Sequence, residues 1–155
     1  MGYVYFHGEG LEEVRKGVYR LAANRLCVPT PLQAAIALAL ERFSGGLERE
    51  FNDFMGELKR RRDYAFKALS ELEGLEVAEP RGAFYPFPRL SLDVEDSELV
   101  RRLLVEKGVL VVPGSGFSMH DRQYFRVVFL PPVEILKEAF TKMGEFLRGL
   151  ASAGP

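Results

Sequence analysis

The sequence has a single cysteine, Cys27, and therefore cannot form an internal disulfide. This usage favours a reducing compartment, and we expect a cytoplasmic protein. Side-chain amides are also scarce, being limited to Asn24, Gln33, Asn52 and Gln123, while Arg, Lys and Glu are plentiful. That bias is seen in heat-adapted proteins and hints at a thermophilic source.

Several classes of protein are disfavoured by what else is missing. No apolar run reaches the roughly 18 residues that a membrane span needs, and the start MGYVYFHGEG shows neither a basic segment nor a cleavage pattern. We therefore expect no membrane anchor and no signal peptide. The net charge of −1 gives no reason to expect a nucleic-acid partner. His7 and His120 lack acidic or thiol partners at metal-ligand spacing, so no metal site is predicted.

The first half of the chain reads as one strand followed by three helices. Aromatic and β-branched residues in GYVYFHG predict a strand, and apolar spacing predicts a helix over EGLEEVRKGVYRLAANRL. Pro31 suits the first turn of a second helix, PLQAAIALALERF, whose apolar residues on most sides predict burial. A long amphipathic helix is expected from Leu47 to about Glu73. Such length is typical of a connector between two bodies.

The second half predicts a small sheet with packed helices in the order ββαββα. The strands are expected in LEVAEP, GAFYPFPRL, VLVVPG and around Arg126. A helix capped by Asp96 or Ser97 and ended by Gly108 separates the two strand pairs. The last helix starts after Pro132, and the tail ASAGP is expected to fray. The fold class predicted from this order is α+β.

Arg126 stands in the middle of a predicted strand, QYFRVVFLPP. Alternation places Phe125, Val127 and Phe129 on one face and Arg126 on the other. Both faces are apolar, which predicts a strand covered on both sides and a permanent charge in a mostly buried setting. The pattern leaves two alternatives open: a structural role, in an ion pair or a bond to helix-end carbonyls, or a bidentate clamp on a small carboxylate or phosphate.

Other polar motifs carry weaker signals. PGSGF at Pro113–Phe117 resembles an anion-binding loop but lacks the Gly-Lys-Ser/Thr of a phosphate loop, and a flexible turn is the simpler interpretation. KRRRD at Lys59–Asp63 reads as a solvated helix face. Ser115, Ser118 and His120 show no nucleophile–base pattern. Cys27 is interpreted as a small apolar packing residue.

Five segments, taken together and in order, resemble one family. RLCVPTPLQ, ELKRRRDYAFKALSEL, EPRGAFYPFPRL, VLVVPGSGF and YFRVVFLPP look like the C-terminal part of the class I/II pyridoxal-phosphate aminotransferases, with the alanine-aminotransferase-like branch fitting best. The resemblance implies that Arg126 binds the α-carboxylate of an amino-acid or 2-oxo-acid substrate. It also implies pyridoxal phosphate in the complete enzyme, and a dimer.

The family's Schiff-base lysine lies in a Ser-x-x-Lys-like segment, and none of the six lysines here has that context. The chain therefore looks like a fragment or truncated paralogue that is inactive alone, holds no cofactor, and contributes no catalytic residue of its own. The resemblance divides it into a remnant of the large domain (1–45), a connecting helix (46–73), a C-terminal small domain (74–150) and the tail (151–155). We further expect self-association through residues 1–45, by pairing of the GYVYF edge strand or by exchange of the segment.

Two other readings stay open. The chain is a non-enzymatic module that binds small carboxylates through Arg126 or pairs with another subunit. Alternatively, it is a structural domain in which Arg126 forms an internal ion pair.

Overall fold

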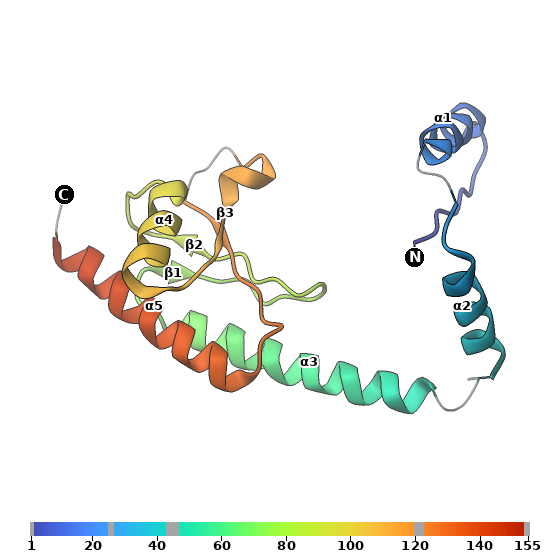
Figure 1. Ribbon diagram of the computed structural model, residues 1–155. Coiled ribbons are helices and arrows are strands. Elements are labelled where there is room, and N and C mark those ends of the chain that lie inside the picture. Colours follow the sequence, from blue (N-terminus) through green and yellow to red (C-terminus); the bar gives the residue numbers. More distant parts are fainter. Residues whose placement is uncertain (1, 25–26, 43–46, 120–122, 154–155) are drawn as a thin grey trace. The chain divides into compact units, whose positions relative to one another are not determined.

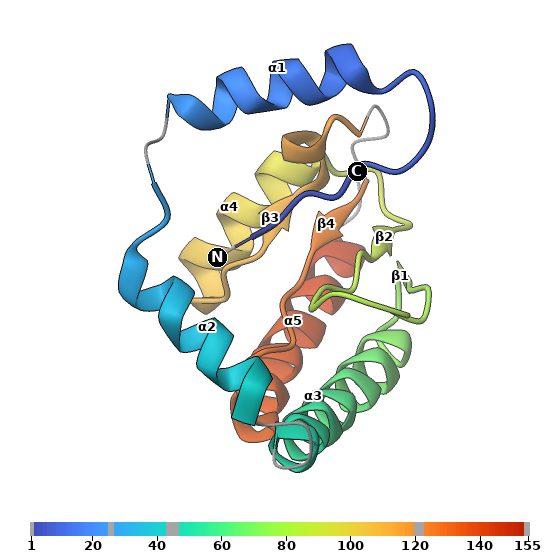
Figure 2. The same ribbon diagram turned by 90° about the vertical axis from the view of Figure 1, so that its right-hand side faces the viewer.

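The computed structural model describes residues 2–24, 27–42, 47–119 and 123–153 (Figures 1 and 2). The chain separates into two compact units, Met1–Asn52 and Asp53–Pro155. None of the helices in the described ranges is long and apolar enough to cross a membrane.

The first unit contains two helices, α1 (Glu12–Ala23) and α2 (Thr30–Arg42). The strand predicted near the start is wrong, because residues 2–7 form no ladder with any described segment. A strand needs a neighbour for its backbone groups, and aromatic composition alone does not supply one. The predicted burial of α2 is also wrong: none of its residues is buried, and Leu40 is 74% exposed.

The second unit is built from the expected series of short strands and helices. Its elements, in chain order, are α3 (Leu47–Ser70, which starts in the first unit), β1 (Leu75–Glu76), β2 (Arg89–Leu90), α4 (Asp96–Lys107), β3 (Val112–Pro113), the 3-10 turn η1 (Gly114–Phe117), β4 (Phe125–Arg126) and α5 (Val133–Ala153). The predicted ββαββα order is confirmed, and the helix-rich arrangement with two small antiparallel sheets is compatible with the α+β class.

The strands are shorter than the sequence predicts. β1 pairs with β2, β3 pairs with β4, and the bridge between Arg89 and Tyr124 joins the two pairs. Beyond that bridge the backbone N–H of Val127 donates to the carbonyl of Pro86 at 3.0 Å, and that of Phe125 donates to Pro88 at 3.1 Å. Proline has no N–H to return the bond. Residues 84–88 therefore run along β4 with half of a normal antiparallel ladder.

The core lies on one face of these strands. Phe125, Val127 and Phe129 point into it and are at most 5% exposed. Helices α3, α4 and α5 supply the opposing residues, including Leu69, Leu103 and Phe140. In Figure 2, β3 lies in front of α4 and β4 lies in front of α5. The result is a two-layer unit whose second sheet face carries Arg126.

Candidate functional site

Arg126 is held in the middle of the second unit's sheet. β3 pairs with β4 on one side, with Val112 opposite Arg126. Residues 84–88 accept hydrogen bonds from β4 on the other side. Because the side chains of successive strand residues alternate, the buried neighbours Phe125 and Val127 force the Arg126 side chain onto the face away from the core.

That face is not covered as the sequence predicts. Arg126 is partly buried, Leu130 is 39% exposed and Leu110 is 72% exposed. Helices α3, α4 and α5 pack on the core face, so no helix described within residues 53–119 and 123–153 forms a second layer here. The charge of Arg126 is therefore shielded by its immediate neighbours rather than buried in a core.

Two aromatic rings flank the guanidinium of Arg126. Its Cζ lies 4.4 Å from the ring centroid of Tyr85 and 4.4 Å from that of Phe117. Tyr85 belongs to the segment on one side of β4, and Phe117 to the turn that follows β3 on the other side. Cation–π contacts of this kind are worth about 0.5–2 kcal/mol each, more when shielded from water. Each ring thus presents its face to the guanidinium carbon.

The hydrogen-bonding groups of Arg126 are not used inside the described chain. Its Nε–H is enclosed and has no hydrogen-bond partner. None of the acidic residues in the described ranges forms an ion pair with it. A buried guanidinium donor without an acceptor is costly. The internal ion pair considered from the sequence is therefore absent from the part of the chain that the structure describes.

The turn PGSGF is ordered by a buried carboxylate. Asp96 is 2% exposed, and its Oδ2 accepts the backbone N–H of Ser115 at 2.6 Å while Oδ1 accepts the Ser115 hydroxyl at 3.2 Å. Asp96 is thus not the cap of α4 that the sequence predicts. Glu95 occupies the N-cap position, without a side-chain cap bond. The flexible turn expected here is instead a 3-10 turn tied to a helix.

Gly114, directly before Ser115, is a second fixed point at the start of the turn. Its N–H donates to the Tyr124 carbonyl at 2.8 Å, and a Cβ at this position would lie 2.7 Å from the same oxygen. Sequence reasoning missed both Asp96 and Gly114. One signal in the sequence could have indicated their roles: an acidic residue at the start of a helix can bind the N–H groups of a Gly-Ser turn instead of capping the helix.

The remaining polar candidates are surface features. Arg60 and Arg61 both bond Glu57, as expected of a solvated face. These two hydrogen bonds lower the pKa of the Glu57 carboxyl to about 2. His7 stacks on Tyr5 at 6.3 Å, and His120 lies outside the described residues. Among the described residues, no group of acidic, His and Cys side chains could hold a metal ion.

Two further corrections concern residues near these motifs. Cys27 is exposed, not packed as predicted, because its segment lies in the first unit, where little is buried. Ser118 ends the 3-10 turn with a φ of 60° and has no catalytic partner in the described residues.

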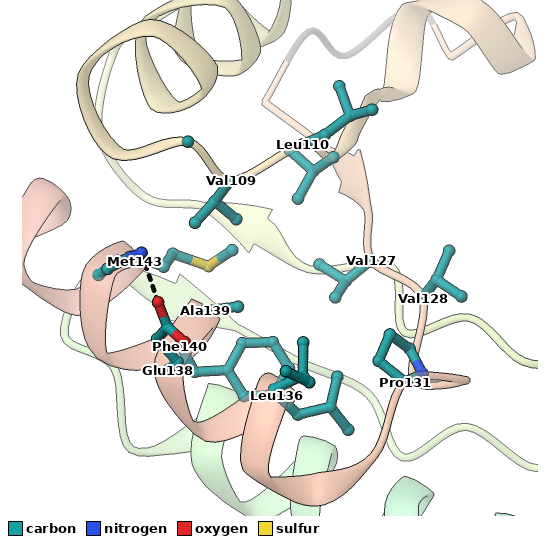
Figure 3. A pocket seen from close by; sticks show the side chains of 14 residues that line it. Val109, Leu110, Val127, Val128, Pro131, Leu136, Glu138, Ala139, Phe140 and Met143 are labelled. Atoms are coloured by element: carbon teal, nitrogen blue, oxygen red, sulfur yellow. Dashed lines mark hydrogen bonds and ion pairs between the residues drawn. The ribbon is translucent and has the colours of Figure 1, made fainter.

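Two cavities lie away from Arg126. Figure 3 shows one of about 290 Å³ between α5 and the chain that leaves β4, lined mainly by apolar side chains such as Val109, Val127 and Leu136. At its edge the Lys142 ammonium donates to Glu138 at 2.6 Å, so its charges are paired. A larger cavity of about 510 Å³ lies between α3 and residues 81–84. Neither is lined by Arg126.

The lysines do not fit a cofactor at Arg126. All six lie on helices, at Lys16, Lys59, Lys67, Lys107, Lys137 and Lys142. In the second unit those helices cover the core face of the sheet, whereas the Arg126 side chain lies on the other face. The described helices of the second unit thus place no lysine on the face that carries this arginine.

Comparison with known proteins gives a consistent result. The model of the family described as aminotransferase class I and II matches residues 1–142. Glutamate-pyruvate aminotransferase AlaA of Haemophilus influenzae is 37% identical over 139 residues, covering 85% of this chain and 33% of that protein. The (5-formylfuran-3-yl)methyl phosphate transaminase of Methanocaldococcus jannaschii is 35% identical over 147 residues. The match covers 95% of this chain and 37% of that transaminase.

A solved structure agrees with these relatives. Alanine aminotransferase from Pyrococcus furiosus superposes with a TM-score of 0.78 at 40% identity, over 91% of this chain and 35% of that one. The chain therefore spans about a third of the length of the relatives it matches.

Proposed function

This chain belongs to the class I and II aminotransferases, and from that premise we propose that it takes part in moving an amino group between an amino acid and a 2-oxo acid, with Arg126 holding the substrate's α-carboxylate. Family membership supports amino-group transfer. The role of Arg126 rests on the site itself.

The observation that carries this assignment is the state of the guanidinium. Arg126 is flanked by two rings at 4.4 Å and has no acidic partner among the described residues. An arginine held in place with free donors is ready for an anion from outside. A carboxylate is planar and offers two oxygens, which match two parallel N–H groups of the guanidinium edge. Fixing the carboxylate fixes the neighbouring carbon at which the chemistry occurs.

Pyridoxal phosphate is the cofactor that the family implies for the complete enzyme. The lysines described above do not fit it, so we propose that it is held by residues other than these 155 and that this chain alone is inactive. Its own contribution is to bind and orient substrate.

The resemblance also supports a division of labour along the chain. We propose that residues 1–45 correspond to part of a large cofactor domain, 46–73 to a connecting helix and 74–150 to a small domain that closes over substrate. The length of α3, 24 residues, suits the connecting role. The single cysteine fits the cytoplasmic location expected from the sequence.

One alternative is favoured by the same absence of a suitable lysine. A module that binds small carboxylates through Arg126 without catalysis, or that pairs with another subunit, needs no cofactor. Mixing the chain with pyridoxal phosphate, reducing with borohydride and measuring its mass tests the assignment. We expect sparse labelling of exposed amines only. Stoichiometric labelling of one lysine, with half-transamination of alanine, would show that the chain carries its own catalytic amine.

The carboxylate role is tested by titrating pyruvate into the chain while following the backbone N–H signals around residue 126 by NMR, which both the chain and its variants possess. Arg126→Lys keeps the charge but loses the fork, so we expect affinity to fall by about 1.5–3 kcal/mol, roughly ten- to a hundredfold. Arg101→Lys is the matched control, because Arg101 is a surface residue paired with Glu98 at 2.7 Å. Equal binding by the chain and by Arg126→Lys would remove Arg126 from the site.

A further inference from the structure

Asp96 is a buried charged residue whose bonds serve no helix cap. It is 2% exposed, and both carboxylate oxygens accept from Ser115, through the backbone N–H and the hydroxyl. Burying a carboxylate costs free energy unless each oxygen is hydrogen-bonded. Such a group is maintained where it fixes a local geometry, and the geometry it fixes here is the turn Gly114–Phe117.

The turn is restrained at its first two residues. Asp96 holds Ser115 from α4, and Gly114 lies against the Tyr124 carbonyl with no room for a side chain. A 3-10 turn of four residues has few internal hydrogen bonds, so these outside restraints decide its position. Phe117 ends the turn, and the Ser118 N–H, which donates to the Ser115 carbonyl at 3.3 Å, links that end to the anchored residues.

Phe117 in turn sets one face of the arginine site. Its ring lies 4.4 Å from the Arg126 Cζ and meets the Phe87 ring edge-on at 5.9 Å. Phe87 stacks on Tyr124 at 5.6 Å. Tyr85 lies 4.4 Å from the same Cζ. These contacts restrain the guanidinium before any ligand arrives.

We infer that Asp96 is a positioning residue: through Ser115 it holds Phe117 against Arg126, so that the guanidinium is already ordered when it meets a planar carboxylate. This inference rests on the proposed carboxylate role of Arg126. The enclosed Nε–H directs the ligand to the two terminal nitrogens. A ligand of this class is a small monocarboxylate whose carboxylate end enters first.

Ordering the arginine beforehand spares the entropy that binding would otherwise cost. Immobilising one long side chain changes affinity by about three- to tenfold. Loss of the Asp96 bonds frees the turn and removes Phe117 from the guanidinium. Ligand binding must then order the arginine side chain, and the affinity falls by the entropy that this ordering costs.

The test uses the ¹⁵N-labelled 155-residue chain and two readouts. The first, without ligand, is solvent exchange and ring-current shift of the Arg126 Nε–H signal. The second is the affinity for pyruvate. For Asp96→Asn and Phe117→Leu we expect faster Nε–H exchange, loss of the ring-current shift and about three- to tenfold weaker pyruvate binding. Ser115→Ala, which keeps the backbone bond to Asp96, should move both readouts in the same direction by less. Phe117→Tyr keeps a ring and should restore them.

Asp93→Asn is the matched control, since Asp93 is exposed and three residues before Asp96. It should change neither readout. If Asp96→Asn unfolds the chain, Ser115→Ala and Phe117→Leu still test the positioning role. Phe117 is 42% exposed, so its replacement leaves the core intact. Unchanged Nε–H exchange and pyruvate affinity in these variants would overturn the positioning role.

The two proposals fail separately. Loss of Nε–H protection in the variants, with no pyruvate binding to any form of the chain, would support the positioning of Arg126 and refute its carboxylate role. Pyruvate binding that depends on Arg126 but not on Phe117 or Ser115 would support the carboxylate role of Arg126 and refute the positioning role of Asp96.

Discussion

Residues 1–52 and 53–155 contain similar kinds of apolar residues but use them differently. In the second unit Leu69 is fully buried and Phe125 is 1% exposed, whereas in the first unit Tyr19 is 76% exposed and Leu40 is 74% exposed. Helix α2 is rich in apolar residues, yet none of its residues is buried. The difference shows that burial is a property of the partners a segment meets, and that hydropathy only states how much a segment would gain from meeting them.

The largest expected consequence of this contrast is association. An exposed apolar helix is an interaction surface until it is covered, and we propose that chains self-associate through residues 1–45. The edge-strand route loses its basis, because residues 2–7 are not a strand. Light scattering should show an assembly for the whole chain and a monomer for a version starting at Leu47. Association that survives the truncation, or a well-ordered monomer of the whole chain, would contradict this.

A matched pair of leucine substitutions sharpens the comparison. Leu69→Ala in the second unit should lower the free energy of unfolding by about 2–5 kcal/mol, because it leaves a cavity in a closed core. Leu40→Ala in the first unit should change it by less than about 0.5 kcal/mol. Urea unfolding followed by circular dichroism measures both. Equal losses would mean that Leu40 is packed in solution.

Replacing a glycine by alanine should change stability in opposite directions in the two units. Gly114→Ala places a Cβ 2.7 Å from the Tyr124 carbonyl oxygen, and we expect a loss of about 1–3 kcal/mol from overpacking. Gly17→Ala lies inside α1 with nothing within 4 Å, and should stabilise that helix by about 0.5–1 kcal/mol. Thermal melts of both variants give the signs. A neutral Gly114→Ala would show that the turn is free to move.

The smallest expected effect concerns acid. Glu57 has its pKa lowered to about 2 by hydrogen bonds from Arg60 and Arg61. A lowered folded-state pKa means that the ionised carboxylate stabilises the fold above its unfolded pKa of about 4.3. That contribution is lost as the pH falls from there towards 2. Urea midpoints between pH 5 and pH 2 should fall less for Glu57→Gln than for the unaltered chain. Parallel curves would refute the coupling.

The sequence predicts the second unit better than the first. The periodicity of α4, α5 and the later part of α3 was sufficient because those segments find a sheet to cover, whereas Phe51 and Phe54 of the expected α3 stripe are exposed. Gly108 ends α4, as predicted, with a φ of 68°. The buried role of α2 failed for want of a described partner. Strand lengths failed because hydropathy does not register that Pro86 and Pro88 cannot donate.

At the site, the sequence predicted Arg126 as a candidate but did not predict the roles of Asp96 and Phe117 around it. Arg126 stands out as a charge in an apolar strand. Asp96 and Phe117 are 30 and 9 residues away from it in the sequence, and only the paired strands bring them together. Asp96 also had a local explanation, a helix cap, that matched its position and was wrong. A residue with two possible partners cannot be assigned from the nearer one alone.

The prolines opposite β4 have a consequence for the solubility of the chain. GAFYPFP is rich in aromatic residues, and such stretches readily stack on copies of themselves as strands. Pro86 and Pro88 accept from β4 through their carbonyls but have nothing to donate to a copy. A stack of such segments would lack a bond at each of these positions in every layer. The stretch that brings Tyr85 to the guanidinium is therefore protected against the self-pairing that its composition would otherwise invite.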